Sequence, residues 1–326
     1  MNAERGLTLL ELVVALAIGT LVVLTAAAMY AQSLKIATWT DNTAILMDKQ
    51  LYGVAGLVEQ LRLAGLGIDD DYAQAVLIDP AQLTGLTQGG SALSTRFLTQ
   101  SNHGQATQGM TASDKLTIRY VAPMDMYDCE GDLVLGPRRV RLTNGELVMV
   151  DGQVVIERYF VSSDDDGLAL RCDAARYITD SIERDGSRDR RGSMYTNAVI
   201  DEQVKSHLKN QPAIRKPYQL KGAGTQNRAG TVIMADIDGF WVQLLTMQAG
   251  QIRQISIDDY RNQPTKTPII GIKFAIISRA RSDLSVDQSS KLVQIFVKPV
   301  RLPADGIARR LHTADVMFVN VKQQVP

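Results

Sequence analysis

The strongest hydrophobic pattern in the chain is an apolar run near its N-terminus. Residues 7–31 contain a single charged side chain, Glu11. A run of this length can span a bilayer, which needs roughly 20 apolar residues. Positive charge before the run, at the amino terminus and Arg5, places its start in the cytoplasm and the rest of the chain outside the inner membrane. A cleavable secretory signal is the alternative, but the run is too long for one and offers a cleavage site only at 26–28.

A helical pattern continues beyond the apolar run. Apolar residues recur at spacings of four and three, at Met47, Leu51, Val54, Val58 and Leu61. This stripe predicts a helix half packed on a globular domain. Gly65 and Gly67, followed by three aspartates, supply a stop. We therefore expect a stem over residues 7–66, with a helix from Leu7 to about Ala64 that is roughly 87 Å long. A coiled-coil membrane anchor is the alternative, although few heptads are visible.

After Pro80 the pattern changes to loop-rich sequence up to Met110, and strand patterns then follow in two parts. The first part, 67–172, has expected strands at 116–120, 140–142, 147–150, 154–161 and 168–170. Turn residues at 136–137, 144–145, 151–152 and 165–167 predict hairpins that join these strands in an antiparallel meander. The second part, 231–326, has expected strands at 232–234, 240–245, 252–257, 269–277, 292–297 and 316–321.

A polar segment, 173–230, divides the two strand-rich parts. It contains a charged run at 183–191 and a glycine-rich stretch at 221–225, and we expect a surface insertion with some helix at 198–208. The predicted fold class is α+β. A long N-terminal stem helix, with a transmembrane half and an amphipathic half, packs on an antiparallel β-rich globular head.

The amino-acid composition argues against several classes of function. The 326 residues are 45% hydrophobic, enough for one large core or two small ones, and 35 basic residues balance 35 acidic ones. A net charge of zero argues against a protein that binds nucleic acid through bulk positive charge. His103, His207 and His312 are too few and too scattered, even with two cysteines, for a zinc or iron–sulfur ligand set, so we expect no metal and no cofactor.

Enzyme motifs are also missing from the sequence. There is no nucleophile elbow, P-loop or His-Glu-x-x-His helix, and the Gly222-x-Gly224 pair lacks the third glycine and the preceding strand of a dinucleotide site. Acidic clusters at 69–71 and 164–166 could bind calcium, but turn and helix-stop chemistry explains them more simply. The arginines of 184–191 alternate with acidic residues, which favours a solvated stretch over a DNA contact. We expect a chain that is not an enzyme.

Glu11 is the one acidic residue in the apolar run, and its position indicates what the run does. A carboxylate at mid-span costs roughly 3 kcal/mol to insert, although the helix dipole and nearby head groups soften this cost close to the cytoplasmic end. The first residues, MNAERGLTLLELVVALAIG, resemble the class III signal of type IV pilins and their relatives. That signal has a charged leader ending in glycine, a cut before a hydrophobic residue and a carboxylate at the fifth processed position. Gly6, Leu7 and Glu11 occupy these places.

The resemblance implies that prepilin peptidase removes the leader, 1–6, and that the new amine of Leu7 is methylated. In a filament, Glu11 would neutralise the Leu7 ammonium of a neighbouring subunit, since an unpaired charge in an apolar core is costly.

Later stretches, taken in order, are similar to the PilW family of minor pilins. These are 61–65, 113–120, 128–131, 155–161, 170–172, 235–243, 272–279 and 309–311. The resemblance implies a non-catalytic filament subunit of a Gram-negative bacterium. It would join other minor pilins in a tip complex that primes pilus assembly and supports twitching motility, adhesion or DNA uptake.

The partners and the location follow from the same resemblance. They are the other minor pilins, the major pilin, prepilin peptidase and the inner-membrane assembly platform. The head would lie in the periplasm before assembly and outside the cell in the pilus afterwards, with direct nucleic-acid binding not expected. A type II secretion pseudopilin is the alternative within this class. A membrane-anchored hydrolase or sugar-binding head is the alternative from another class.

A periplasmic head is a setting in which disulfides persist. Cys129 and Cys172 each lie beside an expected strand, so we expect them to pair. Closing a loop of about 44 residues would restrict the unfolded chain by about 4 kcal/mol in the chain-entropy treatment. Two free buried thiols are the alternative if the domain stays in the cytosol.

Overall fold

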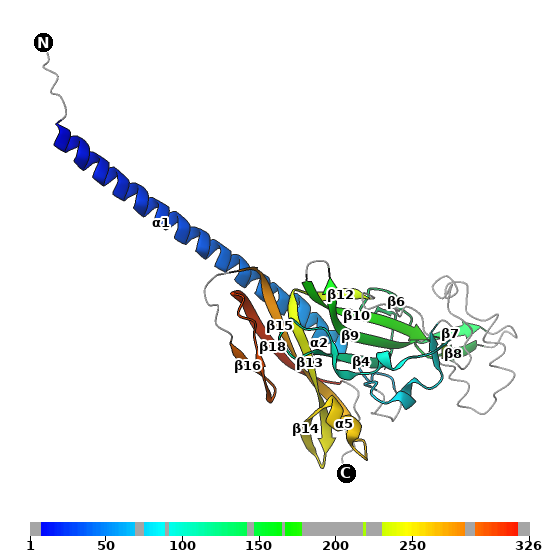
Figure 1. Ribbon diagram of the computed structural model, residues 1–326. Coiled ribbons are helices and arrows are strands. Elements are labelled where there is room, and N and C mark those ends of the chain that lie inside the picture. The colour runs from blue at the N-terminus through cyan, green and yellow to red at the C-terminus, as the bar shows by residue number, and fades with distance from the viewer. Residues whose placement is uncertain are drawn as a thin grey trace.

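The computed structural model describes residues 8–68, 75–88, 91–141, 147–164, 167–177, 218–219, 230–283 and 291–318. A long helix extends from one side of a head made largely of strands (Figure 1). The predicted fold class, a long apolar helix followed by an antiparallel β-rich head, is confirmed.

Three consecutive segments build the helix. They are α1 (Leu9–Asp48), the π-helical turn η1 (Lys49–Val54) and α2 (Ala55–Leu61). Every side chain from Thr8 to Asp41 is exposed, and burial against the head begins at Asn42. The helix ends at Leu61, three residues before the expected end. The expected stop is present, because Gly65 and Gly67 have φ values of 79° and 67°.

The buried face of the helix differs from the expected stripe. Met47 and Leu51 are 51% and 65% exposed, whereas Leu46 and Leu57 are buried. The π-helical turn explains the difference, since its wider winding changes the phase between residues before and after it. The same turn places Gly53 against the head, where an added Cβ would lie 2.5 Å from the Met234 Cε atom.

Two antiparallel sheets form most of the head. The first has the order β12-β10-β9-β4-β3 and the second the order β14-β13-β15-β18. Their strands are β3 (Gln100–Gly104), β4 (Ser113–Val121), β9 (Val154–Asp164), β10 (Gly167–Tyr177), β12 (Thr231–Ala235), β13 (Ile237–Gln248), β14 (Gln251–Ser256), β15 (Ile269–Asp283) and β18 (Ile307–Met317). A short helix, α5 (Ile257–Asn262), follows β14.

Smaller elements surround the two sheets. The pairs β5 (Met126–Tyr127) with β6 (Leu133–Val134), β7 (Arg138–Arg141) with β8 (Leu147–Val150), and β16 (Leu292–Ile295) with β17 (Lys298–Arg301) are antiparallel hairpins. In a three-stranded sheet, β1 (Leu86–Gln88) pairs with β2 (Ser91–Ala92) and, in parallel, with β11 (Tyr218–Gln219). The 3-10 helices η3 (Pro80–Leu83) and η4 (Thr95–Phe97) lie nearby in the sequence.

One apolar core connects the helix to both large sheets. Leu57 and Leu61 of α2 lie in a single cluster with Tyr159 of β9 and Phe274 of β15. A second cluster, which includes Leu83 and the 3-10 helical Phe97, fills the region expected to be loop-rich. The strand-poor composition of 81–110 therefore conceals a packed segment.

The expected meander is wrong in its pairing. Among the described strands, β9 pairs with β4 and β10, and not with β8, so 151–152 is not a hairpin turn; 136–137 likewise separates β6 and β7, which do not pair. The chain leaves the sheet after β4 and returns beside its point of exit. Ala122 donates its N–H to the Gln153 carbonyl, and a Cβ on Gly152 would clash with the Ala122 carbonyl oxygen.

Element boundaries also differ from the sequence expectations. Strand β12, placed in 231–326, pairs with β10 in the first sheet, and residues 173–177 of the expected insertion belong to β10 itself. The expected strand 252–257 ends at Ser256, because Ser256 caps α5. The expected helix at 198–208, the arginine run, the Gly222-x-Gly224 pair and the aspartates at 69–71 lie outside the described residues.

The burial of α2 leads to a stability prediction. Leu61→Ala should lower the free energy of unfolding by about 2 to 5 kcal/mol, because Leu61 is fully buried and its removal leaves a cavity. Leu51→Ala removes the same atoms from an exposed site on the same helix and should change it by less than about 0.5 kcal/mol. Urea unfolding of the detergent-solubilised chain, followed by tryptophan fluorescence, measures both. Equal losses would contradict this account of the helix–head core.

Candidate functional site

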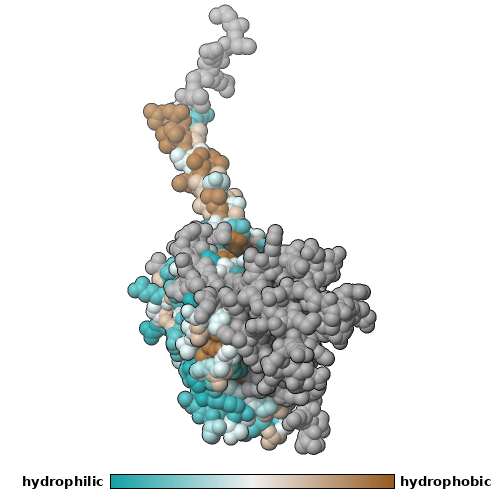
Figure 2. All heavy atoms as spheres, turned by 90° about the vertical axis from the view of Figure 1, so that its right-hand side faces the viewer, coloured by the Kyte–Doolittle hydropathy of each residue, from teal (hydrophilic) through white to brown (hydrophobic). Residues whose placement is uncertain are grey.

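The exposed part of α1 is the first functional feature of the molecule. Hydrophobic residues cover most of it, mainly toward its free end (Figure 2). From Leu12 to Leu34 no residue is charged, a stretch of roughly 33 Å at the helical rise. Within the described residues, one helix, Leu9–Leu61, is long and apolar enough to cross a membrane by length and composition. An apolar surface of this extent requires a lipid or protein covering.

The threonine hydroxyl groups of α1 donate hydrogen bonds to carbonyls of the same helix. Thr20 Oγ1 donates to the Ala17 carbonyl at 2.9 Å, and Thr25 Oγ1 donates to the Val22 carbonyl at 2.8 Å. Because each of these hydroxyl protons is bonded to a carbonyl of the preceding turn, it needs no hydrogen bond to water. The threonines are therefore compatible with an apolar environment.

Glu11 lies at the N-terminal end of this surface. It forms a capping box with Thr8, in which the Thr8 N–H donates to Glu11 Oε2 at 2.9 Å and the Thr8 hydroxyl donates to the same oxygen at 3.0 Å. The Glu11 N–H donates in return to Thr8 Oγ1 at 3.3 Å. Among the described residues, Oε1 accepts no hydrogen bond. The carboxylate thus stabilises the helix start through one oxygen and presents the other at the surface.

Lys49 fixes the stem to the head. Its ammonium contacts Asp236 Oδ2 at 3.1 Å and the carbonyls of Asp236 and Arg279 at 3.3 and 2.9 Å. Both side chains of the ion pair are largely buried. Asp236 has a φ of 51°, a conformation that turns the chain between β12 and β13. The lysine therefore joins the π-helical turn to the place where the two sheets meet.

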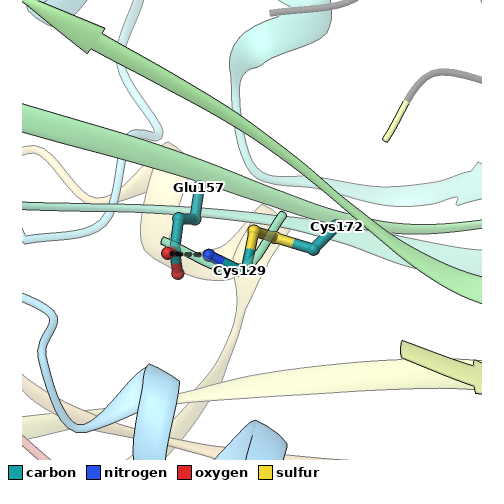
Figure 3. A group of neighbouring side chains, drawn as sticks. All are labelled: Cys129, Glu157 and Cys172. Atoms are coloured by element: carbon teal, nitrogen blue, oxygen red, sulfur yellow. Dashed lines mark hydrogen bonds between the residues drawn. A yellow bond between two sulfur atoms is a disulfide. The ribbon is translucent and has the colours of Figure 1, made fainter. Parts of the chain in front are cut away.

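Cys129 and Cys172 form a disulfide, the pairing that the sequence predicts, with a Cα–Cα distance of 6.1 Å. Glu157, on β9, lies beside it (Figure 3). Its Oε1 accepts hydrogen bonds from the Cys129 N–H and the Tyr120 hydroxyl, both at 3.0 Å, and its Oε2 accepts one from the Tyr159 hydroxyl at 2.6 Å. Three donors thus hold a fully buried carboxyl group.

The ligand atoms of Cys129, Glu157 and Cys172 lie within 4.8 Å of one another, the spacing of a metal site. The chemistry of the donors does not fit a metal ion in this state. The two sulfurs are bonded to each other, so neither is a thiolate, and Glu157 already accepts three hydrogen bonds. Burial raises the pKa of Glu157 to about 7, and its hydrogen bonds limit that rise.

The structure separates the predicted site residues into two groups. Gly6 and Leu7 lie outside the described residues, Glu11 begins the exposed helix, and the two cysteines lie in the head. Sequence reasoning missed Glu157 and Lys49. An adjacent charged pair, Glu157 and Arg158, within the otherwise apolar run 154–161 was the available signal for Glu157. For Lys49 no local signal exists, because its partners are distant in the chain.

Comparisons with known proteins bear on the N-terminus alone. Residues 1–27 match a family described as the prokaryotic N-terminal methylation motif. No curated protein and no solved structure matches the chain. The match covers the exposed start of the helix and supports a type IV pilin-like protein, a structural subunit of the pilin or pseudopilin type. It also implies processing by prepilin peptidase, assembly with other pilins and membrane anchoring before assembly.

The disulfide leads to a second stability prediction. Replacing Cys129 and Cys172 together with alanine should lower the free energy of unfolding by about 4 kcal/mol, since the unfolded chain regains the freedom of the closed loop. Urea unfolding with and without a reductant measures the loss. The reductant should destabilise the wild type and leave the double variant unchanged. A reductant effect of equal size on both proteins would contradict the assignment.

Glu157 leads to a pH prediction. Its folded pKa of about 7 exceeds the ordinary carboxyl value, so the folded state binds more protons between these values and stability falls as pH rises from about 4.5 to 7. The loss from Glu157 is at most about 3 kcal/mol. Glu130 and Asp114, raised by burial to pKa values of about 7 and about 6, act in the same direction. Glu157→Gln should flatten the profile measured by urea unfolding from pH 5 to 8, and an unchanged slope would exclude Glu157 as a source.

Proposed function

We propose that the chain is a non-catalytic minor pilin of a type IV pilus, similar to the PilW family, that joins a minor-pilin complex and primes filament assembly. In this role, prepilin peptidase cuts between Gly6 and Leu7, and the stem then lies among the stems of neighbouring subunits. The head lies on the outside, at or near the filament tip. Twitching motility, adhesion or DNA uptake would depend on it.

The observation that carries the proposal is the place of Glu11. The carboxylate is exposed, lies within the matched motif and directly precedes a stretch of more than 20 residues without another charge. A helix that served only as an anchor would be more stable in lipid without it, because a carboxylate in a span costs up to roughly 3 kcal/mol. A filament subunit has a use for the charge, because cleavage creates a cation at Leu7 of every neighbour.

The geometry is compatible with pairing between subunits. The Thr8 capping box occupies Glu11 Oε2 and holds the side chain at the helix start. Within the described part of the chain, Oε1 has no such contact and can accept a hydrogen bond from an ammonium group. A charged pair of this kind in a water-excluded core avoids the cost of two isolated charges.

The rest of the molecule is consistent with a subunit in which the position of the stem determines the orientation of the head. Lys49 and the core around α2 hold the stem in one orientation, and the disulfide stabilises the head in an oxidising compartment. Packing of the stem at a fixed position among the neighbouring stems would therefore also orient the head. A merely tethered enzyme has no need for this coupling.

Replacing Glu11 separates a filament subunit from an anchored protein. Glu11→Leu should leave membrane insertion and leader cleavage intact but lower incorporation into sheared filaments at least tenfold, since the neighbour's cation loses its partner. Immunoblots of membrane and sheared fractions measure the two effects. Crosslinking to adjacent pilins should fall in parallel.

Two control variants make this test specific. Glu11→Gln keeps the size and the capping acceptor without the charge, so it should behave like Glu11→Leu if charge pairing is the cause. Glu59→Leu removes an exposed carboxylate from α2 and should have no effect on incorporation. Normal incorporation and crosslinking of Glu11→Leu would contradict the pairing mechanism and favour a plain anchor.

A further inference from the structure

The disulfide and Glu157 form a compact group inside the head (Figure 3). Cys129 lies in the loop between β5 and β6, Glu157 on β9 and Cys172 on β10. The two sulfur atoms and one carboxyl oxygen of Glu157 lie within 4.8 Å of one another. Cys172 and Glu157 are fully buried, whereas Cys129 is half-buried. A reagent from solvent therefore reaches the disulfide from the Cys129 side.

The burial of Cys172 limits how its sulfur can exchange a proton. Thiol–disulfide exchange proceeds through thiolates, and a thiolate without water around it is costly. A base within reach of Cys172 would take its proton as the disulfide closes. The same group, as an acid, would return the proton as the disulfide opens. Glu157 occupies this position in the described part of the head.

Glu157 is suited to both proton transfers. Its carboxyl group accepts hydrogen bonds from neutral donors, which are the Tyr120 and Tyr159 hydroxyls and the Cys129 N–H. Burial raises the pKa of Glu157 to about 7, although these hydrogen bonds lower it. Both protonation states are therefore populated near neutral pH, the condition in which one group serves as acid and as base.

Other charged groups lie near Glu157 but outside the group of three. The charge of Asp128 adds to the effect of burial on the pKa of Glu157, and Asp128 itself forms an ion pair with Arg176 at 2.8 Å. Glu130 accepts a hydrogen bond at 3.0 Å from the N–H of Ala174, the residue paired with Glu157 across β9 and β10. Burial raises the pKa of Glu130 to about 7 as well. Glu130 is thus a matched control for Glu157.

We propose that Glu157 is the proton acceptor and donor for closing and opening of the Cys129–Cys172 disulfide within the folded head. This role is chemical and adds to the hold that Glu157 has on the Cys129 loop. The inference does not depend on the role in a filament, so it can be tested whether or not the chain assembles.

Closure begins when an oxidant that carries a disulfide, such as oxidised glutathione, forms a mixed disulfide with Cys129 and releases one thiol. Cys172 then passes its thiol proton to the Glu157 carboxylate, and its sulfur attacks the Cys129 sulfur. The bond from Cys129 to the oxidant breaks, and its electron pair leaves on the oxidant's sulfur. The proton on Glu157 then passes to that thiolate. Two electrons move from the cysteine pair to the oxidant, and opening by a dithiol follows the same steps in reverse.

Opening by dithiothreitol tests the proposal on the full chain in detergent, without urea. A thiol-reactive mass tag counts free cysteines over time, and each rate is divided by the concentration of dithiothreitol thiolate. For the wild type, this corrected rate should fall about tenfold from pH 6 to pH 8, because Glu157 loses the proton it donates as the pH passes about 7. The rate should also rise in proportion to the reductant, as attack on the folded head requires.

Glu157→Gln should lower the corrected rate at pH 6 at least about tenfold and remove its pH dependence, since an amide keeps the size and an acceptor but transfers no proton. A purely structural role predicts the opposite sign, because a less stable head exposes the disulfide and opens faster. Glu130→Gln should keep the fall between pH 6 and pH 8, because Glu130 is not in the group of three.

Tyr159→Phe gives a second test, which stands even if Glu157→Gln does not fold. It removes a hydrogen bond that lowers the pKa of Glu157, so the fall in rate should move to higher pH. An unchanged fall in Glu157→Gln, an unmoved midpoint in Tyr159→Phe, or loss of the fall in Glu130→Gln would overturn the proposal. Faster opening of Glu157→Gln at pH 6 would do the same, as would a rate independent of the reductant, which would mean that the disulfide opens only after unfolding.

Discussion

Burial of Leu57 and Leu61 beneath both sheets is the constraint on which the rest of the structure depends. These two side chains bring one helix into the core of the head, and Lys49 holds the preceding π-helical turn by an ion pair with Asp236. The helix before Asn42 has no such cover. A single rigid element is thus packed like a core helix at one end and bare at the other. Its apolar bare end has to be covered by lipid or by other helices.

This division assigns separate tasks to the two ends of the chain. The bare end contains Glu11 and much of the matched N-terminal motif, which implies membrane anchoring and assembly with other pilins. The head contains the disulfide and the buried Glu157, and both lie among the strands that form its core. Because the stem and the head share one core, a change in the orientation of the stem also changes the orientation of the head. A filament subunit requires this property, whereas a flexible tether would not provide it.

Local sequence determined some of these features and long-range packing determined others. The apolar helix and its glycine stop follow from residue type alone, as does the cysteine pair once a periplasmic head is assumed. The phase of the buried stripe does not, because it depends on the π-helical turn, in which Gly53 lies against Met234 of the distant strand β12. The pairing of β4 with β9 also depends on distant residues, since the chain between them leaves the sheet and returns beside Ala122. A pocket lined by residues of η3 and α5 depends most on long-range packing, because these two elements meet only in the folded head.

Mass spectrometry of purified, sheared filaments tests the central claim most directly. The account predicts that the chain is present in them, that it begins at Leu7 with a methylated amine, and that Cys129 and Cys172 remain joined. A chain that is found only in the membrane, with its N-terminus at Met1 or after Ala28, would contradict it. That result would leave the exposed helix as an anchor and the Leu7 amine unavailable to any neighbour's Glu11.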